Sequence, residues 1–467
     1  MSREEEIIKE KEKKLEELKK QGINPYPHKF EKKDSAEKCL KAKTGTKVKT
    51  AGRLMTKRDI GKIIFSDMQD STGKIQLVFQ DKKTDKKDFD FFRKYVDIGD
   101  IVGIEGKIFK TKTGQHSILV KNLELLSKSL LPLPSKWYGL QDKEERYRKR
   151  YLDLIMNPEV RDIFKKREKI IDSIRSLLKD KEYLEVETPL LQPLYGGAEA
   201  RPFTTSLYAL NLNMYLSISP ELYLKRLIAG DFEGVFTICK NFRNEGIDKL
   251  HNPEFTMMEL YVSYTDYNDM IDITEKLLAN AAKKTTGKTE VIYQGKKISF
   301  KTPFKRMKMF DAIKKYAGVD PKKLSPEKIE EVFDEKVQPH LIQPTFIIDY
   351  PKELCPLTKE HRKDKSFVER FELFVNGAEL ANAYSELNDP VEQEKRLHKQ
   401  TETRKKAKDF DAHVEANIID KDFVESMSYG MPPLGGVGIG IDRLVMLLTN
   451  QPSIRDVILF PFMKPEK

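Results

Sequence analysis

Residues 242–261 read FRNEGIDKLHNPEFTMMELY, an order of charged, aromatic and apolar side chains that is typical of two strands joined by a polar loop. The first strand-like run is GVFTICKNFRNE at 234–245, and the second is PEFTMMELYVSY at 253–264. Both runs are rich in β-branched and aromatic residues, which favour strands. The segment therefore predicts an antiparallel hairpin with an unusual number of charges near its loop.

The second strand of this hairpin has two chemically different faces, because alternate residues of a strand point to opposite sides. One face carries two aromatics, a methionine and a carboxylate: Phe255, Met257, Glu259 and Tyr261. The other face is mostly apolar and is the natural core face: Thr256, Met258, Leu260 and Val262. We therefore expect the first set to face a cleft, where a buried carboxylate needs a cation or a hydrogen-bond partner.

The loop end of the hairpin offers groups that suit a nucleotide. Arg243 matches the geometry of a phosphate, and Phe255 can stack on a flat base. His251 lies further along the loop. The alternative interpretation is an ordinary surface salt bridge between Arg243 and Glu245.

A second hairpin is predicted within ERFELFVNGAELANAYSELNDP, residues 369–390, where Asn-Gly at 376–377 is a strong turn signal. A two-residue turn there pairs Phe374 with Glu379 and Glu372 with Ala381, which places Glu372 diagonally from Glu379 on one face. Two such carboxylates suit Mg²⁺ when phosphate oxygens complete its coordination. The alternative is a pair of solvated carboxylates on an exposed sheet.

Strict alternation places Asn382 and Glu386 on the opposite face of this hairpin from Glu372 and Glu379. A bulge or a strand end near 381–384 would be needed to bring all four side chains into one cleft.

A glycine-rich strand is predicted at 435–441 within PPLGGVGIGIDRLVMLLTN, residues 432–450, followed by a helix from Asp442. Glycines permit close approach by a ligand, and Arg443 falls in the first helical turn, which favours anions. The spacing matches neither a dinucleotide-binding fingerprint nor a phosphate-binding P-loop. The alternative is that the glycines serve tight strand packing.

Residues 46–126 have the pattern of a small β-barrel. The predicted strands are 46–57, 61–69, 74–80, 100–110 and 115–126. A helical segment at 84–96 falls after the third strand, which is the order of an OB-fold. Phe65 and Gln76 lie on the second and third strands, where an aromatic can stack on a base and an amide can read a base edge. The alternative for Phe65 is a core position.

The second half of the chain changes to a pattern of helices and long strands. Helices are predicted near 142–155, 159–181, 219–230, 266–285, 305–316 and 390–407. Strands are predicted near 202–217, 233–243, 254–264, 344–348, 370–386 and 435–441. Long strands mixed with helices suggest an antiparallel sheet with helices around it.

Composition sets further bounds on the chain. It has 467 residues and a formal net charge of +11, which favours a polyanionic partner such as nucleic acid. Three widely spaced cysteines without a CxxC pair make a disulfide framework or a zinc site unexpected. No run of 18 apolar residues is present, and the N-terminus MSREEEIIKEKEKK does not resemble a signal peptide, so we expect a cytoplasmic protein.

The sequence resembles the class II lysyl-tRNA synthetases of the bacterial type over about residues 46–467. Three segments resemble the three class II motifs in order: KEYLEVETPLL at 181–191, the FRNEG to HNPEFTMMELY hairpin, and GIGIDRL at 438–444. The segments RYRKRYLDL, GGAEARPF and SPELYLKRL lie between the linker and the second motif. The resemblance implies an α+β fold in which an anticodon-binding OB-fold barrel precedes a class II antiparallel sheet flanked by helices.

The domain boundaries expected from this resemblance are an N-terminal helix and lead-in at 1–45, the OB-fold at 46–127, a linker at 128–144 and the catalytic domain at 145–467. The implied activity is that of a lysine–tRNA ligase. Lysine and ATP form lysyl-adenylate and pyrophosphate, and the lysyl group then passes to the 3′ end of tRNA(Lys). The implied partners are ATP, L-lysine, tRNA(Lys), Mg²⁺ and a second copy of the chain in a homodimer, with no membrane.

The resemblance also implies a role for each matching residue. Arg243 and Arg443 are the expected catalytic cations at the phosphates. The expected ATP-binding residues are Arg243, Glu245, His251, Phe255, Glu372 and Arg443. The expected Mg²⁺ ligands are Glu372 and Glu379. The expected lysine-binding residues are Gly197, Glu221, Glu259, Tyr261, Asn382 and Glu386. Phe65 and Gln76 are expected to bind the anticodon.

Three other functions remain as alternatives. The synthetase paralogue that modifies elongation factor P lacks the barrel expected at 46–126. An aspartyl- or asparaginyl-tRNA synthetase would be expected to place cations where this chain has Glu259 and Glu386. A catalytically silent RNA-binding protein on the same fold is disfavoured by a complete set of expected phosphate and metal contacts: Arg243, Glu372, Glu379 and Arg443.

Overall fold

The computed structural model describes residues 2–134, 140, 142–355, 358–405 and 419–466, and the chain divides into two compact units, Met1–Leu140 and Gln141–Lys467. The division falls within the segment 128–144 that was predicted as a linker, of which 135–139 and 141 lie outside the described residues. A search of the described helices found none long and apolar enough to cross a membrane. Each unit has its own hydrophobic core.

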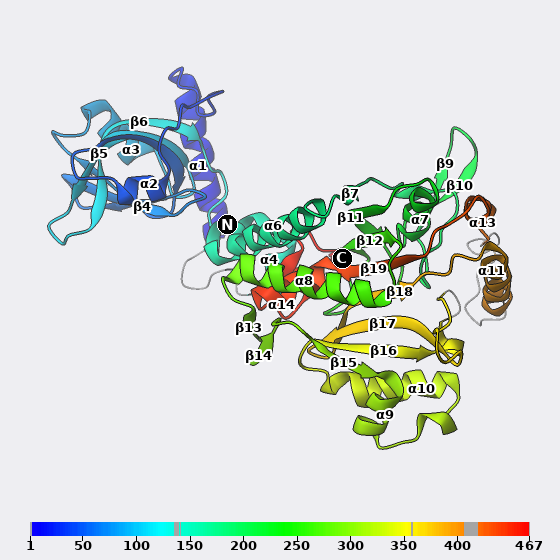
Figure 1. Cartoon of the computed structure of the whole chain (residues 1–467). Helices are drawn as coiled ribbons and strands as arrows, with labels where there is room; N and C mark the ends of the chain where they lie inside the picture. Colours follow the sequence, from blue (N-terminus) through cyan, green and yellow to red (C-terminus); the bar gives the residue numbers. More distant parts are fainter. Residues whose placement is uncertain (1, 135–139, 141, 356–357, 406–418, 467) are drawn as a thin grey trace. The chain divides into compact units, whose positions relative to one another are not determined.

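The first unit is a closed β-barrel with the predicted OB-fold order (Figure 1). Its strands are β1 (Lys47–Leu54), β2 (Arg58–Asp59), β3 (Ile63–Gln69), β4 (Lys74–Gln80), β5 (Ile101–Lys110) and β6 (His116–Ser127). The barrel closes because β1 pairs with β5 on one side and with β3 on the other. Helix α3 (Lys86–Tyr95) follows β4, as the sequence predicted, and the two-residue β2 is an addition.

Two helices precede the barrel. Helix α1 (Arg3–Lys20) starts at a capping box in which Ser2 and Glu5 satisfy each other's backbone N–H groups. Its Leu18 joins the barrel core, as does Cys39 of α2 (Ala36–Lys41).

The second unit is built on a mixed sheet that has eight strands in the described residues, in the order β15-β16-β17-β18-β19-β12-β11-β7. These strands are β7 (Leu184–Glu185), β11 (Gly234–Phe242), β12 (Glu254–Ser263), β15 (Lys305–Lys308), β16 (Thr345–Pro351), β17 (Phe367–Val375), β18 (Ala378–Ser385) and β19 (Leu434–Gly440). The central pairings are antiparallel, as predicted, while β7–β11 and β15–β16 at the two edges are parallel. The predicted hairpins are β11–β12 and β17–β18.

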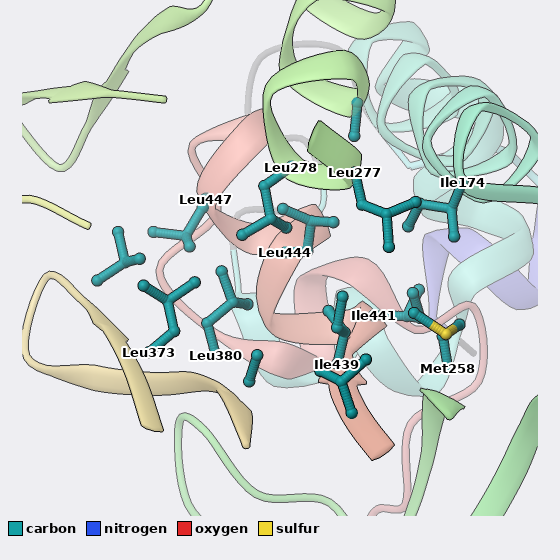
Figure 2. Close-up of a cluster of buried hydrophobic side chains, with 14 of the residues drawn as sticks. Ile174, Met258, Leu277, Leu278, Leu373, Leu380, Ile439, Ile441, Leu444 and Leu447 are labelled. Atoms are coloured by element: carbon teal, nitrogen blue, oxygen red, sulfur yellow. The ribbon is translucent and has the colours of Figure 1, made fainter. Parts of the chain in front are cut away.

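Three helices cover one face of this sheet: α6 (Pro158–Lys179), α8 (Tyr267–Thr286) and α14 (Ile441–Thr449) (Figure 1). Figure 2 shows where they meet the sheet, with Ile174 of α6, Leu277 of α8 and Leu444 of α14 close to Met258 and Ile439 of the strands. Because Met258, Leu260 and Val262 lie in this core, the opposite face of β12 is free to carry polar side chains.

The remaining elements differ in places from the sequence prediction. Residues 305–308 were predicted as helical, but they form β15, and α9 (Met309–Ala317) begins only after them. The predicted strand at 202–217 is two strands, β9 (Thr204–Leu207) and β10 (Leu212–Leu216), joined by a turn in which Asn211 has a φ of 49°.

The other described helices and short strands surround the sheet at its edges and ends. They are α4 (Lys143–Arg148), α5 (Arg150–Met156), β8 (Leu191–Gln192), α7 (Glu221–Ala229), β13 (Glu290–Tyr293), β14 (Lys296–Ser299), α10 (Pro326–Val332), α11 (Pro390–Lys405), α13 (Lys421–Ser428) and α15 (Ile454–Val457). The single helix predicted at 142–155 is therefore two helices, α4 and α5, and residues 406–407 of the helix predicted at 390–407 lie outside the described residues.

Candidate active site

The second unit contains a cavity of about 460 Å³ on the polar face of its sheet. All of the candidate residues predicted in this unit line it: Gly197, Glu221, Arg243, Glu245, His251, Phe255, Glu259, Tyr261, Glu372, Glu379, Asn382, Glu386 and Arg443. They come from segments far apart in the sequence, and the fold brings the second and third motif regions to one place.

Strand β19 makes room for the polar side chains of both neighbouring strands. Its Gly438 lies opposite Glu259 of β12 and Asn382 of β18, and its Gly436 lies opposite Tyr261 and Tyr384. A Cβ on Gly436 would collide with Glu386 Oε1 and with the Tyr261 ring. These contacts support the interpretation that the glycines serve close packing, because the packed side chains form the cavity wall. The approach of a ligand to these glycines stays a prediction.

A β-bulge in β18 resolves the conflict of faces in the second hairpin. Phe374 pairs with Glu379 as predicted, but Leu373 pairs with Ala381, which leaves Leu380 as an extra residue. The predicted pairing of Glu372 with Ala381 is therefore wrong, and Glu372 lies opposite Asn382. The extra residue comes just before the range 381–384 that was considered for a bulge.

The bulge places both groups of polar side chains on the cavity face. Glu379 lies before the extra residue, while Asn382, Tyr384 and Glu386 follow it, and all four line the cavity. Ala383, between Asn382 and Tyr384, belongs to the hydrophobic core instead.

One part of the cavity has the cations and aromatics that suit a nucleotide. The Arg243 guanidinium lies 5.1 Å from the centroid of the Phe255 ring, and its buried Nε has no hydrogen-bond partner. No ion pair joins Arg243 to Glu245 in the described part of the chain, so the surface salt bridge does not form. Arg443 approaches His251, with 3.0 Å between Nη2 and Nε2, and its Nη1 donates to the Glu379 carbonyl oxygen at 2.7 Å.

The two carboxylates predicted to bind a metal lie at the edge of this region and also line an adjoining cavity of about 380 Å³. Glu372 accepts hydrogen bonds from Tyr350 Oη at 2.8 Å and from Arg370. Burial raises the pKa of Glu372, and the nearby charge of Glu379 raises it further, whereas Arg370 opposes both effects. A cation between the two carboxylates would relieve this repulsion.

A complete protein-made metal site is not found in the described residues, where no cluster of three or more His, Cys, Asp or Glu side chains could hold an ion. The two glutamates fit a cation that takes its other ligands from substrate phosphates and water. Cys39, Cys239 and Cys355 are all free thiols, in line with the expectation from their spacing.

The opposite part of the cavity is acidic and buried. Glu259 is 5% exposed and accepts hydrogen bonds from Ser219 Oγ at 2.9 Å and from Tyr261 Oη at 3.2 Å. Burial raises the pKa of Glu259 to about 8, with a further contribution from the charge of Glu221. A carboxyl with these properties binds an ammonium group well, because the ammonium restores its charged form.

Glu221 and Glu386 share an internal cation that the sequence prediction did not include. Lys225 Nζ lies 2.6 Å from Glu221 Oε1 and 2.6 Å from Glu386 Oε2. Burial raises the pKa of Glu386 to about 7 even though Lys225 opposes the shift, and Glu386 Oε1 has no hydrogen-bond partner. The ion pair between Glu221 and Lys225 could have been predicted from their i,i+4 spacing on a helix. The contact of Lys225 with Glu386 could not, because it joins segments that only the fold brings together.

Gly197 lies beside the same acidic region. Its φ of 83° is in the left-handed range, and a Cβ would come within 2.9 Å of Glu221 Cβ and 3.0 Å of Ser219 Oγ. The position therefore requires glycine and leaves its backbone open to the cavity.

Arg370 is a second, partly buried cation that sequence reasoning missed. It lies between Glu372 and Asn382, to which its Nε donates at 3.3 Å, and its guanidinium is 4.6 Å from the Tyr350 ring centroid. An arginine two residues before Glu372 on the same face of a strand could have been suspected from alternation alone.

The two residues predicted to bind an anticodon share one face of the barrel. Phe65 pairs with Val78 and is half-buried, and the Arg58 guanidinium lies 5.4 Å from the centroid of its ring. Gln76 pairs with Asp67, two residues along β3, and Ser117 Oγ donates to its Oε1 at 2.9 Å. Phe65 therefore lies outside the barrel core, unlike its neighbour Ile64.

Comparison with known proteins agrees with both units. A family model described as class II tRNA synthetases (D, K and N) matches residues 142–464, and one described as an OB-fold nucleic acid binding domain matches 48–126. A lysine–tRNA ligase of Carboxydothermus hydrogenoformans is 49% identical, with 98% of each chain covered. A lysine–tRNA ligase 2 of Methanosarcina mazei is 50% identical over 96% of this chain and 92% of its own. This chain belongs to the class II tRNA synthetases, within the family of lysine–tRNA ligases.

Proposed function

We propose that this protein joins L-lysine to tRNA(Lys) in two steps, with lysyl-adenylate as the intermediate. The observation that carries the choice of amino acid is the acidic end of the cavity, where Glu221, Glu259 and Glu386 lie together. Lysine has two ammonium groups and one carboxylate, and a buried pocket of carboxylates recognises such a ligand and excludes anionic ones. The relatives are named for the same reaction.

The first step requires orientation more than acid–base chemistry. An oxygen of the lysine carboxylate attacks the α-phosphorus of ATP, the bond to the β-phosphate oxygen breaks, and pyrophosphate leaves with the electron pair. The attacking group is already an anion, so no protein base is needed. Catalysis then comes from in-line positioning and from cations near the phosphates.

Arg243 is the best-placed side chain for the α-phosphate. Its buried Nε lacks a partner in the described structure, its guanidinium lies near the Phe255 ring, and its charge acts on Glu259 of the acidic region. Phe255 and Arg443 offer an aromatic face and a guanidinium for the adenine ring. Arg443, Glu245 and His251 complete the ATP-binding set.

Glu372 and Glu379 are the residues that would hold Mg²⁺ with the phosphates of ATP. A bound Mg²⁺ would supply charge neutralisation for the triphosphate and fix its geometry. Arg370 orients the Glu372 carboxylate, which keeps one side of this pair in place.

Different residues of the acidic pocket suit each of the two ammonium groups of lysine. Glu259, Tyr261 and Glu386 suit the side-chain ammonium because they lie deep in the wall, where Glu259 and Glu386 are 5% and 2% exposed. Glu221 and the open backbone of Gly197 suit the α-amino group. Asn382 offers a further polar contact.

The second step transfers the lysyl group to a hydroxyl of the terminal adenosine of tRNA, and AMP leaves. The barrel face that carries Phe65 and Gln76 would stack on and read the anticodon. This function places the protein in the cytoplasm, where translation takes place.

A homodimer is part of the same proposal. Leu184, Leu190 and Leu191 belong to the first motif segment and are 41–46% exposed in the single chain. Neighbouring exposed leucines suit burial against a second copy. Sedimentation at twice the mass of one chain would support a dimer, and sedimentation as a monomer at micromolar concentration would contradict it.

The direct test of the function is aminoacylation of tRNA transcripts with radiolabelled lysine. We expect charging of a transcript with a UUU anticodon, in the presence of ATP and Mg²⁺, and weak charging when the anticodon is changed. Charging with aspartate or asparagine would keep the family and contradict the substrate.

A further inference from the structure

Two carboxylates of the acidic pocket are bridged by one internal ammonium group. Lys225 is 2% exposed, and its Nζ makes ion pairs of 2.6 Å with both Glu221 and Glu386. Glu221 and Lys225 are one turn apart on α7, while Glu386 follows β18. Lys225 therefore links α7 to the end of β18 at the acidic pocket.

Lys225 acts from behind the cavity wall. Among the described residues that line the cavity, Glu221 and Glu386 are present and Lys225 is not. A ligand in the cavity would meet the two carboxylates on the side opposite Nζ. Any effect of Lys225 on the ligand must then pass through Glu221 and Glu386.

The charge of the acidic pocket matches the two ammonium groups of free lysine only when Lys225 is counted. Glu221, Glu259 and Glu386 bring three negative charges when ionised, and Lys225 brings one positive charge, which leaves a formal charge of −2. Substrate lysine carries two ammonium groups. Without Lys225, one buried carboxylate would be unpaired or would take up a proton.

The two ion pairs of Lys225 also determine which carboxylate oxygens of Glu221 and Glu386 are left to bind the substrate. Nζ engages Oε1 of Glu221 and Oε2 of Glu386, while Oε1 of Glu386 is buried and has no partner. A buried carboxylate oxygen such as Glu386 Oε1 needs a hydrogen-bond donor, and the cavity has room for a ligand that supplies this donor.

Lys225 keeps its charge in this setting. Burial alone would lower the pKa of Lys225, but the carboxylates of Glu221 and Glu386 raise it above its ordinary value. Its Nζ also lies 5.7 Å from the centroid of the Tyr261 ring, which adds a weak favourable contact.

We propose that Lys225 is a positioning residue for substrate lysine, holding Glu221 and Glu386 turned so that their free oxygens meet the two ammonium groups. This inference rests on the proposed function. It assigns a part of lysine recognition to a side chain that the substrate does not touch.

The test is ATP–pyrophosphate exchange by the full-length protein without tRNA, with lysine and ATP titrated separately. We expect Lys225→Met to raise the KM for lysine by about tenfold or more and to leave the KM for ATP within about twofold. Lys225→Arg keeps the charge and should recover a part of the lost lysine affinity. Thermal unfolding measured on each variant reports whether it is folded.

The chain offers a matched control in its first unit. Lys128 is equally buried and bridges Asp97 and Asp100, with Nζ–O distances of 2.5 and 2.9 Å. Lys128→Met should lower the unfolding temperature, as Lys225→Met does, but should leave the KM for lysine within about twofold.

Each outcome decides the proposal. An unchanged KM for lysine in folded Lys225→Met, or an equal rise in both KM values, would show a purely structural role and overturn it. If Lys225→Met does not fold, Lys225→Arg decides alone. A rise of about threefold or more in the KM for lysine, without a rise in the KM for ATP, supports the proposal, and unchanged KM values overturn it. Absence of lysine-dependent exchange in the unmodified protein would instead contradict the proposed function.

Discussion

Glu259 shows how a single side chain can be costly to the fold and useful to function. It is buried on the polar face of β12, held by Ser219 and Tyr261, and near the charge of Glu221. Burying a carboxylate without a cation is unfavourable, and the raised pKa of Glu259 expresses that cost. On the proposed function, the ammonium group of substrate lysine would supply the missing cation.

Glu259→Gln tests this role. The amide keeps the shape of the side chain and removes the charge, so lysine binding should weaken by about 2–5 kcal/mol while ATP binding without lysine changes little. Calorimetric titration with each ligand gives both values. An equal loss for lysine and ATP would contradict the assignment of Glu259 to the ammonium group.

The pH dependence of lysine binding follows from the same group. With its pKa raised to about 8, the Glu259 carboxyl is mostly protonated at neutral pH in the free protein, and it must ionise to pair with an ammonium. Lysine binding should therefore release a proton, and the KM for lysine should fall as pH rises from about 6.5 to about 8.5, by up to about tenfold per pH unit.

Glu386 should contribute at the lower end of that range, since its pKa is about 7. Calorimetry in buffers of different ionisation enthalpy measures the proton directly. Proton uptake, or a lysine KM that rises over this pH range, would be inconsistent with the two raised pKa values.

At the scale of elements, the acidic pocket depends on one strand of glycines and one bulge. β19 brings no side chains into the space that Glu259, Tyr261 and Asn382 occupy, and the extra Leu380 turns β18 so that Asn382 and Glu386 face the cavity. The pocket is thus a property of three adjacent strands.

Gly436→Ala probes this arrangement. Its methyl group would collide with Glu386 Oε1 and the Tyr261 ring, so the lysine KM should rise by about tenfold or more and the ATP KM should change less. Gly230→Ala is a suitable control, because a Cβ there would meet only carbonyl oxygens, at 3.4 and 3.5 Å. Similar lysine KM values for both variants would contradict the close packing around Gly436.

The sequence was sufficient to predict the elements that follow a clear pattern. Alternation along β12 separated the core face from the cavity face, and Asn376-Gly377 located the second turn. The register beyond that turn was not predictable, because nothing in GAELANAYS marks Leu380 as an extra residue. The split of 202–217 and the strand at 305–308 were missed for a similar reason, since local propensity does not show which neighbour a segment pairs with.

Contacts between segments far apart in the sequence could not be predicted from local sequence patterns either. The bridge from Lys225 to Glu386 joins residues far apart in sequence, and Arg370 gains its role only through the packing of Tyr350 and Asn382 around it. The candidate residues of the cavity were nevertheless identified from strand faces and from the family resemblance, and all of them line one space.

At the scale of the whole molecule, the proposed function assigns recognition of tRNA and activation of the amino acid to separate compact units. The barrel carries the half-buried Phe65 and Gln76 on one face, and the sheet of the second unit carries the cavity. Changes on the barrel face should therefore affect charging of tRNA without affecting adenylate formation.

Phe65→Ala and Gln76→Ala test this separation. Removal of a stacking ring costs about 1–3 kcal/mol per base, so the kcat/KM for tRNA should fall by about tenfold or more in Phe65→Ala, with a smaller loss in Gln76→Ala. ATP–pyrophosphate exchange should be unchanged in both variants. A parallel loss of exchange in folded protein would contradict separate functions of the two units.

The central claim is that the acidic cavity selects lysine for activation. ATP–pyrophosphate exchange without tRNA, measured with each standard amino acid in turn, tests it most directly. The account predicts exchange with lysine and background levels with aspartate and asparagine. Exchange driven by aspartate or asparagine, or no exchange with any amino acid in folded protein, would contradict it.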